Sequence, residues 1–249
     1  MDSTVLKAID VVEALARSDR PRGITELAEQ LQLTKSNVHR LLQTLGSRGY
    51  LRPRDDGRYE LSLRLWELGS LVLGKLNLKQ VAYAHLETLA DLTRETVHLS
   101  VLDQRDVIYI DKIESPEPVR AYSSLGGRAP AYCVATGKAL LAFASDELIR
   151  SVGASLIPYT SRTIRTEAAL RQVLAQIRHD GYATNSGEWR ESVCGLAAPI
   201  RDARGVVIAA VGISGPAERL KPKRLKSLAP AVVATAGSIS NDLGHAVNR

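Results

Sequence analysis

The chain has 249 residues, of which 45% are hydrophobic and 24% charged, and its formal net charge at pH 7 is +6. This length is enough for two modest domains or one large one, and the hydrophobic content suffices for packed cores. No apolar run reaches the length of a membrane span, and the first ten residues, MDSTVLKAID, lack the layout of a signal peptide. We therefore expect a cytoplasmic protein without a membrane partner.

Cysteine and histidine usage excludes two further classes of protein. The two cysteines, Cys133 and Cys194, are too few for a disulfide framework. The five histidines are scattered and lack the spacing of zinc ligands. We expect no metal and no cofactor, and we expect both cysteines to be small buried apolar side chains.

The first predicted element is an amphipathic helix over residues 5–16, followed by a break at Pro and Gly in SDRPRG (18–23). Its apolar residues at helical spacing are Leu6, Ile9, Val12 (or Val5 and Val12) and Leu15.

Two short helices are predicted next. Thr25 is expected to cap the first of them, and Thr34 is a good N-cap for the second. The stripe predicted to be buried on the second helix consists of Val38, Leu41, Leu42 and Leu45. Polar and basic side chains fall largely outside this stripe. Such a pair of helices, polar at the start of the second, is what a helix-turn-helix needs to enter a major groove.

A basic hairpin follows over residues 49–61, where two alternating runs flank a turn at Asp56-Gly57. In this position a hairpin is typical of a wing, whose arginines contact phosphates or the minor groove. Base reading falls to the helix, since Asn and Gln pair with adenine and Arg with guanine. The predicted contacts to a double-stranded DNA operator are Thr25, Lys35, Ser36, Asn37, His39, Arg40, Gln43, Arg52, Arg54 and Arg58.

A long helical stretch is predicted over residues 61–96, with an interruption near Gly74 and Asn77. Its first half carries more apolar surface than a solvated linker should tolerate. These apolar residues are Leu63, Trp66, Leu68, Leu71 and Val72. We expect this helix to pack against its twin in a homodimer, which suits an operator with two half-sites.

From residue 97 the pattern changes to short alternating strands, VHLSVLD, DVIYIDKI and VRAYSSL. A helix beginning near Thr136 and an amphipathic helix over 166–181 come next. A hairpin of two apolar strands then turns at RDARG, and a last helix runs from about Lys223 to Gly244. This order predicts an α+β domain with one antiparallel sheet and helices packed on it.

Over nearly its full length the chain resembles IclR-type transcriptional regulators. The resemblance lies in GITELAEQLQLTKSNVHRLLQTLGSRGYL, GRYELSLRLWELG, RAPAYCVATGKALLA, IRHDGYATNSGEW and GLAAPIRDARGVVIAAVGISGP. It implies a winged helix-turn-helix domain (1–62), a linker helix (63–80) and a GAF-like effector-binding domain (81–249). It also implies a homodimer or homotetramer on a pseudo-palindromic operator. ETVHLSVLDQRDVIYIDKIES and YSSLGGRAPAYCVATGK are further similar to the branch that responds to 2-keto-3-deoxygluconate.

The resemblance also implies where an effector binds. Family members that take small organic acids hold them between two strands and the start of the ATGK helix, whose free amides attract a carboxylate. Asn185 falls where the family has aspartate, Gly195 where it has cysteine, and Gly212 and Ser214 at two serine positions. These departures imply a less negative, roomier pocket and a larger, hydroxylated or aromatic acid. The implied effector residues are Tyr132, Ala135, Thr136, Asn185, Trp189, Cys194, Gly195, Gly212 and Ser214.

Several residues in and around this implied site also have purely structural interpretations. Lys138 is a solvated lysine of the first helical turn or the partner of an Asp or Glu, while Tyr132 and Trp189 serve packing. Glu188 is a loop or cap residue, and His98 satisfies a hydrogen bond in the core.

An enzyme is not expected. The Gly137-Lys138 pair is no phosphate loop, because Tyr132 and Ala139 stand where that motif needs Gly and Ser or Thr. Two alternatives remain, a GAF-like enzyme and a DNA-binding protein that responds to no effector. The first requires substrate turnover, and the second requires operator affinity that no metabolite changes.

Overall fold

The computed structural model describes residues 3–74 and 78–245 and divides the chain into two compact units, Met1–Leu76 and Asn77–Arg249. Each unit has its own hydrophobic core. Across the two described ranges no helix is both long and apolar enough to cross a membrane. The boundary between the units falls inside the predicted linker (63–80). The functional division into 1–62, 63–80 and 81–249 stays a prediction.

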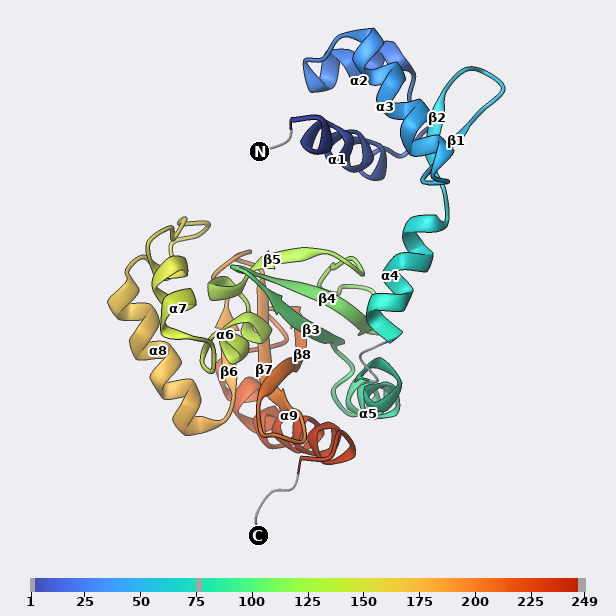
Figure 1. The fold of residues 1–249 in the computed structure, drawn as a ribbon. Coiled ribbons are helices and arrows are strands. Elements are labelled where there is room, and N and C mark those ends of the chain that lie inside the picture. Colours follow the sequence, from blue (N-terminus) through green and yellow to red (C-terminus); the bar gives the residue numbers. More distant parts are fainter. Residues whose placement is uncertain (1–2, 75–77, 246–249) are drawn as a thin grey trace. The chain divides into compact units, whose positions relative to one another are not determined.

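The first unit is a three-helix bundle with a hairpin and a following helix (Figure 1). Its elements are α1 Ser3–Ala16, α2 Ile24–Leu31, α3 Lys35–Ser47, β1 Leu51–Pro53, β2 Tyr59–Leu61 and α4 Arg64–Gly74. The two strands are antiparallel, with Leu51 opposite Leu61. Val38, Leu41 and Leu42 lie in the core, and Leu45 packs against it. The predicted helix pair, its buried stripe and the hairpin are confirmed.

Of the two predicted N-caps, Thr34 is confirmed and Thr25 is wrong. Thr34 is the N-cap of α3, and its hydroxyl accepts a hydrogen bond from the Asn37 N–H at 3.3 Å, as predicted. The cap predicted at Thr25 is wrong, because α2 already begins at Ile24. Gly23, with an extended backbone at φ −85° and ψ 162°, is its N-cap, and no side chain closes the first turn.

The buried face of α1 differs from the predicted stripe. Leu6 and Ile9 are about half exposed, whereas Val11, Ala14 and Leu15 are buried. The apolar residues of α1 lie on two overlapping faces, and periodicity alone does not decide which of them packs against α2 and α3. An apolar face of α1 is therefore exposed.

The long helical stretch breaks as predicted. α4 ends at Gly74 and α5 begins at Leu78, while residues 75–77 lie outside the described ranges. On and just before α4, Leu63, Trp66 and Leu71 are each about two-thirds exposed. The predicted contribution of the Val72 side chain falls outside the described side chains.

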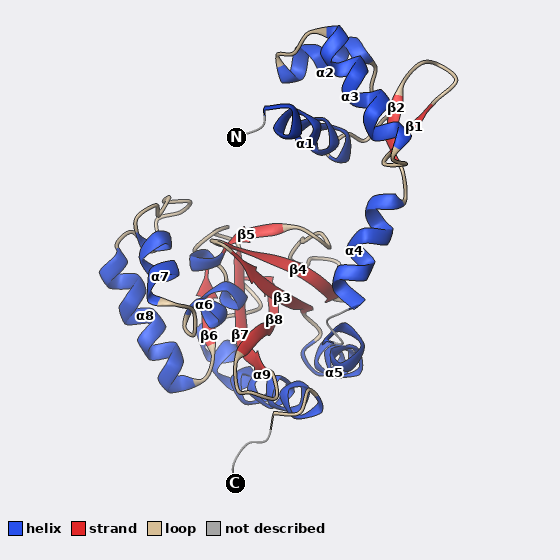
Figure 2. Ribbon diagram, viewed as in Figure 1, coloured by secondary structure: helices blue, strands red, loops and turns tan. Residues whose placement is uncertain are grey.

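The second unit is built on one antiparallel sheet of order β5-β4-β3-β8-β7-β6 (Figure 2). Its strands are β3 Thr96–Asp103, β4 Asp106–Ile113, β5 Arg128–Pro130, β6 Ala183–Ser186, β7 Val193–Arg201 and β8 Val207–Pro216. Its helices are α5 Leu78–Thr93, a 3₁₀ turn η1 Ala131–Cys133, α6 Ala135–Leu141, α7 Asp146–Gly153, α8 Glu167–Asp180 and α9 Pro222–Asp242. α5 and α9 pack together against one face of the sheet, and α6 covers the other (Figures 1 and 2). The expected α+β architecture is confirmed.

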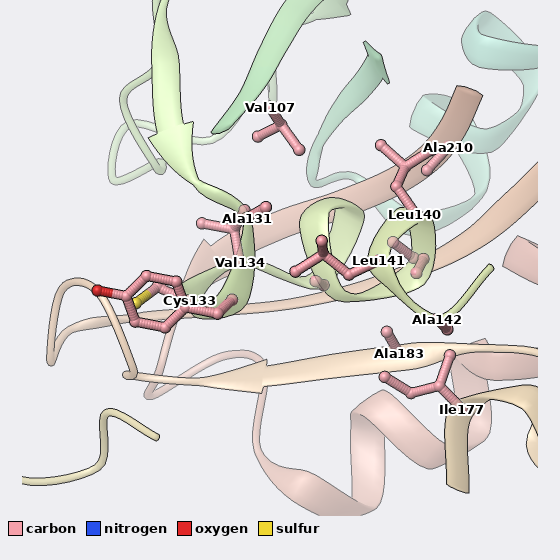
Figure 3. Close-up of a cluster of buried hydrophobic side chains, with 14 of the residues drawn as sticks. Val107, Ala131, Cys133, Val134, Leu140, Leu141, Ala142, Ile177, Ala183 and Ala210 are labelled. Atoms are coloured by element: carbon pink, nitrogen blue, oxygen red, sulfur yellow. The ribbon is translucent and has the colours of Figure 1, made fainter. Parts of the chain in front are cut away.

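The ATGK segment forms the most deeply buried helix of this unit, since every residue of α6 is buried. Leu140 and Leu141 lie in a core with Ile177 of α8 and Ala210 of β8 (Figure 3). A Cβ atom at Gly137 would overlap the backbone of Ala131 in the η1 turn. Glycine is therefore needed here for close packing and not for cradling a phosphate.

One predicted strand is absent. Residues 119–125 (VRAYSSL) form neither strand nor helix, and Val119, Tyr122 and Leu125 are half exposed or more. The alternation predicted a strand, but the partner at this edge of β4 is the short β5, so the segment has no ladder to join. The elements β5, β6 and α7 were not predicted. β3, β4, the β7–β8 hairpin, α8 and α9 lie where the pattern placed them.

Candidate DNA-binding and effector sites

The start of α3 presents polar side chains because its apolar stripe faces the core. Lys35, Ser36, His39, Arg40 and Gln43 are exposed, and Asn37 is half-buried. His39 and Gln43 lie one helical turn apart, with their side-chain nitrogens 3.4 Å apart. Since Val38, Leu41 and Leu42 fix the rotation of α3, the polar face is held outward as a unit.

The hairpin adds exposed arginines, and a DNA phosphate can readily replace the carboxylates with which two of them pair. Arg52, Arg54 and Arg58 are all exposed, as is Thr25 on α2. Arg54 forms an ion pair with Glu60 at 3.3 Å, and Arg58 lies 3.8 Å from Asp56. Exposed pairs of this kind contribute little stability, so a phosphate can replace the carboxylate at small cost. The arginines are available to a polyanion.

A pocket in the second unit lies between the sheet and the N-terminal end of α6. Six of the nine predicted effector residues line it, and they are Ala135, Thr136, Asn185, Trp189, Gly195 and Ser214. They come from α6, β6, β7, β8 and the β6–β7 connection, so the fold brings together residues up to 79 positions apart. The other three, Tyr132, Cys194 and Gly212, lie outside the lining.

Two of these residues, Tyr132 and Gly212, have structural roles. The Tyr132 hydroxyl donates to the Ile157 carbonyl oxygen at 3.0 Å and accepts from the Ile157 N–H at 2.8 Å. A Cβ at Gly212 would lie 2.7 Å from the Ala197 Cβ and 3.0 Å from a Thr136 methyl group. The inference that Gly212 leaves extra room is therefore wrong, because neighbouring side chains fill that space.

Both cysteines are buried and free. Burial raises the pKa of the Cys133 thiol to about 12 and also raises that of Cys194. Both thiols therefore stay protonated near neutral pH, which gives neither of them a nucleophile's character. They pack as apolar side chains, as expected.

His98 of β3 is a pocket residue that the sequence did not single out as a ligand contact. Its Nε2 lies 2.7 Å from the Ser214 hydroxyl, and its Nδ1 lies 3.4 Å from the Ser123 hydroxyl. Burial, assisted by the positive charge of Lys112, lowers the pKa of His98 to about 4. The imidazole is therefore neutral at pH 7, and its ring lies 4.8 Å from that of Tyr109, which also lines the pocket. The expected core hydrogen bond of His98 is confirmed.

Arg190 was missed as well, although it follows the predicted wall residue Trp189. Its guanidinium lies 4.6 Å from the centre of the Trp189 ring, a cation–π arrangement, and it donates to the Tyr122 carbonyl oxygen at 3.3 Å. Among the described residues that line the pocket, Arg190 alone carries a permanent charge. The basic residue beside Trp189 was the one signal that sequence reasoning could have used.

Hydrogen bonds and an ion pair hold the β6–β7 connection that carries Trp189 and Arg190. Asn185 accepts the Glu188 N–H at 3.0 Å, and the Thr163 hydroxyl donates to the Glu188 carbonyl oxygen at 2.6 Å. The Glu188 carboxylate pairs with Lys138 of α6. Of the two interpretations of Lys138, the ion pair is confirmed and the solvated lysine is wrong.

Comparison with known proteins agrees with this geometry. The family model described as "IclR helix-turn-helix domain" matches residues 4–55, and "Bacterial transcriptional regulator IclR C-terminal" matches residues 70–241. The "HTH-type transcriptional regulator KdgR" of Escherichia coli (strain K12) is 37% identical over 98% of this chain and 93% of its own.

Two solved structures cover nearly the whole chain. The Thermotoga maritima IclR structure has a TM-score of 0.80 at 30% identity and covers 98% of this chain and all of its own. An IclR homolog from Microbacterium hydrocarbonoxydans, complexed with 4-hydroxybenzoate, has a TM-score of 0.83 at 28% identity and covers 97% of this chain and 99% of its own.

A winged helix-turn-helix and a separate sheet domain with a pocket define the class of two-domain DNA-binding regulators. The chain belongs to the IclR family of transcriptional regulators. It is a regulator of transcription that binds DNA through its first unit.

Proposed function

We propose that the pocket of the second unit binds a hydroxylated carboxylate and that its occupancy changes the affinity of the protein for its operator. The observation that carries the proposal is the lining, which combines one fixed cation, Arg190, with neutral polar groups and aromatic walls. In this proposal residues 1–62 bind the operator, residues 63–80 form the linker between the two domains, and residues 81–249 bind the effector. A protein with this function works on chromosomal DNA, in the cytoplasm.

The lining limits the chemistry of the effector. Arg190 offers charge-assisted hydrogen bonds to a carboxylate. Asn185 and the neutral His98 add no charge, while the Thr136 and Ser214 hydroxyls can exchange hydrogen bonds with alcohol groups. Trp189 supports a flat or apolar part of the molecule. The bound acid of the Microbacterium homolog, 4-hydroxybenzoate, has a carboxylate, a hydroxyl group and a flat ring. A sugar acid such as 2-keto-3-deoxygluconate has the carboxylate and several hydroxyl groups but no flat ring for Trp189 to support.

Titration calorimetry of the full-length protein tests the effector class. The panel contains 2-keto-3-deoxygluconate, 4-hydroxybenzoate and the uncharged 4-hydroxybenzamide. We expect at least one acid to bind, the amide not to bind, and Arg190→Gln to weaken the acid about tenfold or more. Arg162→Gln is the matched control, because Arg162 lies on a neighbouring turn, bonds to the Ser186 carbonyl oxygen and does not line the pocket. Binding of neutral compounds alone would contradict the proposal.

Operator binding is proposed to be that of a homodimer or homotetramer, with the exposed apolar residues Leu63, Trp66 and Leu71 as part of the contact. A ligand shifts operator affinity only as far as it binds the two protein states unequally, and typical couplings change affinity by about 5–150-fold. The operator can be isolated by selection from random duplex DNA and its affinity measured by fluorescence anisotropy with and without the acid. A monomer in light scattering at micromolar concentration would exclude the dimer.

Incubation of the protein with the acid, together with the anisotropy measurement, separates the alternatives. Consumption of the bound acid during incubation would support a GAF-like enzyme. Operator affinity that no bound acid changes would support a regulator without an effector.

A further inference from the structure

Residues 116–125 belong to no strand or helix, and this segment, called the wall below, lines the pocket with its middle residues. Ala121, Tyr122 and Ser123 line the pocket. Cationic side chains from three other places in the chain hold this segment by its carbonyl oxygens. Lys112 donates to Ser123 at 2.8 Å, Arg190 to Tyr122 at 3.3 Å and Arg219 to Val119 at 2.9 Å. A segment held by side chains and not by a ladder can be displaced without breaking the sheet.

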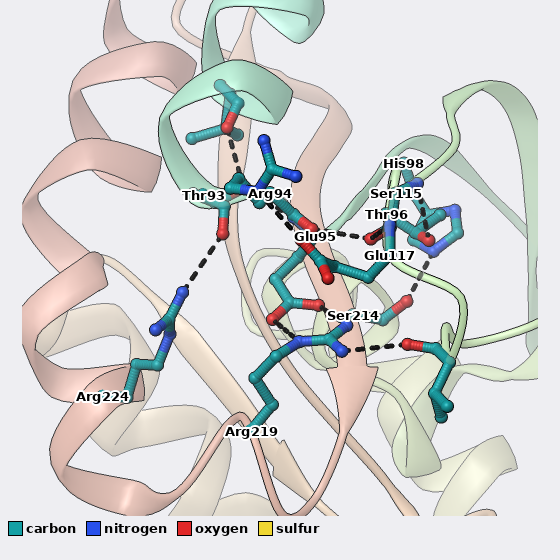
Figure 4. Close-up of polar contacts among 12 residues, drawn as sticks. Thr93, Arg94, Glu95, Thr96, His98, Ser115, Glu117, Ser214, Arg219 and Arg224 are labelled. Carbon is teal, nitrogen blue, oxygen red and sulfur yellow. Dashed lines mark hydrogen bonds and ion pairs between the residues drawn. The ribbon is translucent and has the colours of Figure 1, made fainter.

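Arg219 also binds a second, buried partner. Its Nε and Nη2 lie 2.6 Å from the two carboxylate oxygens of Glu95 (Figure 4). Glu95 is fully buried and lies two residues after the end of α5. A buried carboxylate without a cation is strongly unfavourable, so Arg219 cannot leave Glu95 freely. One guanidinium therefore joins the pocket wall to the turn between α5 and β3.

The start of the wall is bound to the same turn. The Ser115 hydroxyl donates to the Arg94 carbonyl oxygen at 2.6 Å, and the Ser115 N–H donates to the Thr96 hydroxyl at 3.3 Å. Arg94 and Glu117 form an ion pair at 2.8 Å (Figure 4). The turn at 94–96 and the segment that begins at Ser115 are thus connected at several points.

The sheet side of the pocket reaches Glu95 as well. A Cβ at Gly215 would lie 2.9 Å from the Glu95 carboxyl carbon, so the carboxylate rests directly on the backbone of β8. The preceding residue, Ser214, lines the pocket and bonds to His98. The Glu95–Arg219 pair therefore contacts Val119 and Gly215, which adjoin two different sides of the pocket.

We propose that the Glu95–Arg219 pair couples the 116–125 wall to the end of α5 and carries the state of the pocket toward the linker. Arg219 acts as a positioning residue, and α5 is the first element after Leu76 in the chain. A carboxylate at Arg190 competes with the Tyr122 carbonyl for the guanidinium, because a charged carboxylate that can bind the guanidinium through two oxygens is a stronger acceptor than a neutral carbonyl. Binding of this carboxylate therefore weakens one of the three hydrogen bonds that hold residues 116–125 in place. This last step rests on the proposed function, whereas the coupling of wall and turn does not.

Hydrogen exchange of the ligand-free full-length protein tests the coupling without an effector. Arg219→Lys keeps a cation near Glu95 but cannot reach both Glu95 oxygens and Val119 together. We expect peptides covering 119–125 and 90–97 both to exchange roughly tenfold faster, the factor expected for one lost charge-assisted hydrogen bond, with α8 unchanged. Gly215→Ala should give the same pattern, since it displaces the carboxylate while Arg219 remains.

Arg128→Lys is the matched control, because Arg128 forms ion pairs with Asp103 and Asp106 in the same unit and does not contact the wall. Faster exchange restricted to residues near 219 in both variants would overturn the coupling, and so would an equal response in Arg128→Lys. In a second arm, 2-keto-3-deoxygluconate and 4-hydroxybenzoate are added to the wild type. Failure of both acids to alter exchange at 119–125 contradicts the proposed function and leaves the ligand-free result standing.

Discussion

Lys138 and Glu188 form a buried ion pair that joins the central helix α6 to the connection carrying Trp189 and Arg190. The Lys138 Nζ lies 2.6 Å from Glu188 Oε1, and only 3% and 13% of the two side chains are exposed. The pair lies beside the pocket and not in its lining. Its role is therefore to position Trp189 and Arg190 beside the pocket through Glu188.

Removing Lys138 alone should destabilise the protein far more than removing both Lys138 and Glu188. Lys138→Met leaves a buried carboxylate unpaired, which we expect to lower the free energy of unfolding by about 3–5 kcal/mol. The double variant Lys138→Met/Glu188→Leu should recover most of this loss. Urea denaturation followed at the transition of the second unit measures both. Arg171→Met is the matched control, because its ion pairs with Asp146 and Glu167 are exposed and should each contribute less than about 1 kcal/mol. Equal losses in the single and double variants would exclude the charge argument.

Sequence selectivity should depend on the exposed face of α3. Asn37→Ala and Arg40→Ala should each cost about 1–3 kcal/mol on the selected operator and much less on a scrambled duplex. Anisotropy on both duplexes checks this, with circular dichroism to confirm folding. Arg150→Ala, an exposed arginine of the second unit, should leave both affinities unchanged. Undiminished selectivity in the Asn37→Ala/Arg40→Ala double variant would refute the assignment of α3 as the reading helix.

The wing should act differently from the helix. Arg54→Ala should weaken binding to operator and scrambled DNA alike, because a phosphate contact carries no sequence information. The slope of log affinity against log salt concentration should become shallower by about 1. A change confined to the operator would show instead that Arg54 contacts bases.

Stability should depend on pH through His98. Burial, aided by Lys112, lowers its pKa from the ordinary 6.5 to about 4 in the folded protein. Between these values the unfolded chain binds a proton that the folded protein does not. The stabilisation is thus complete above pH 6.5 and lost as the pH falls toward 4, by about 3 kcal/mol in all.

Unfolding free energies measured between pH 4 and 7 for the wild type and His98→Gln isolate this contribution. The variant should show the shallower pH dependence, because it lacks the group that titrates. His179→Gln is the control, since His179 is exposed and should follow the wild type. Parallel profiles for wild type and His98→Gln would contradict a lowered pKa.

Gly137 should tolerate no side chain. In Gly137→Ala the new methyl overlaps the Ala131 backbone, and such overpacking typically costs about 1–3 kcal/mol. Gly237→Ala, in α9, meets nothing within 4 Å and should stabilise by about 0.5–1 kcal/mol because alanine is the better helix former. Thermal unfolding of the two variants should therefore shift in opposite directions.

Local patterns in the sequence predicted the DNA-binding half well. The spacing of Val38, Leu41 and Leu42 fixes which side of α3 is buried, and Thr34 closes its first turn, so the polar face follows from neighbours in the chain. Asp56-Gly57 likewise sets the hairpin. By contrast, α1 carries apolar residues on two faces, and only packing against α2 and α3 decided that Val11 and Leu15 are buried and Ile9 is exposed.

The pocket was only partly predictable. Ala135, Thr136 and Ser214 followed from family resemblance, but His98 and Arg190 lie far apart in the chain, and no local pattern places them in one cavity. Tyr132 was predicted to be either a wall residue or a packing residue, and its hydroxyl is bonded to the backbone of Ile157.

The sequence by itself determined the helix pair and hairpin of the first unit, most helices and strands of the second unit except β5, β6 and α7, the membership of the family and the polar face of the reading helix, because these depend on side chains close together in the chain. Only the tertiary structure decided which distant side chains line the pocket, that Lys138 is buried against Glu188, and that Arg219 joins Val119 to Glu95. Such contacts depend on how strands and helices cross in space, where residues a hundred or more positions apart form hydrogen bonds in a water-poor interior that strengthens them.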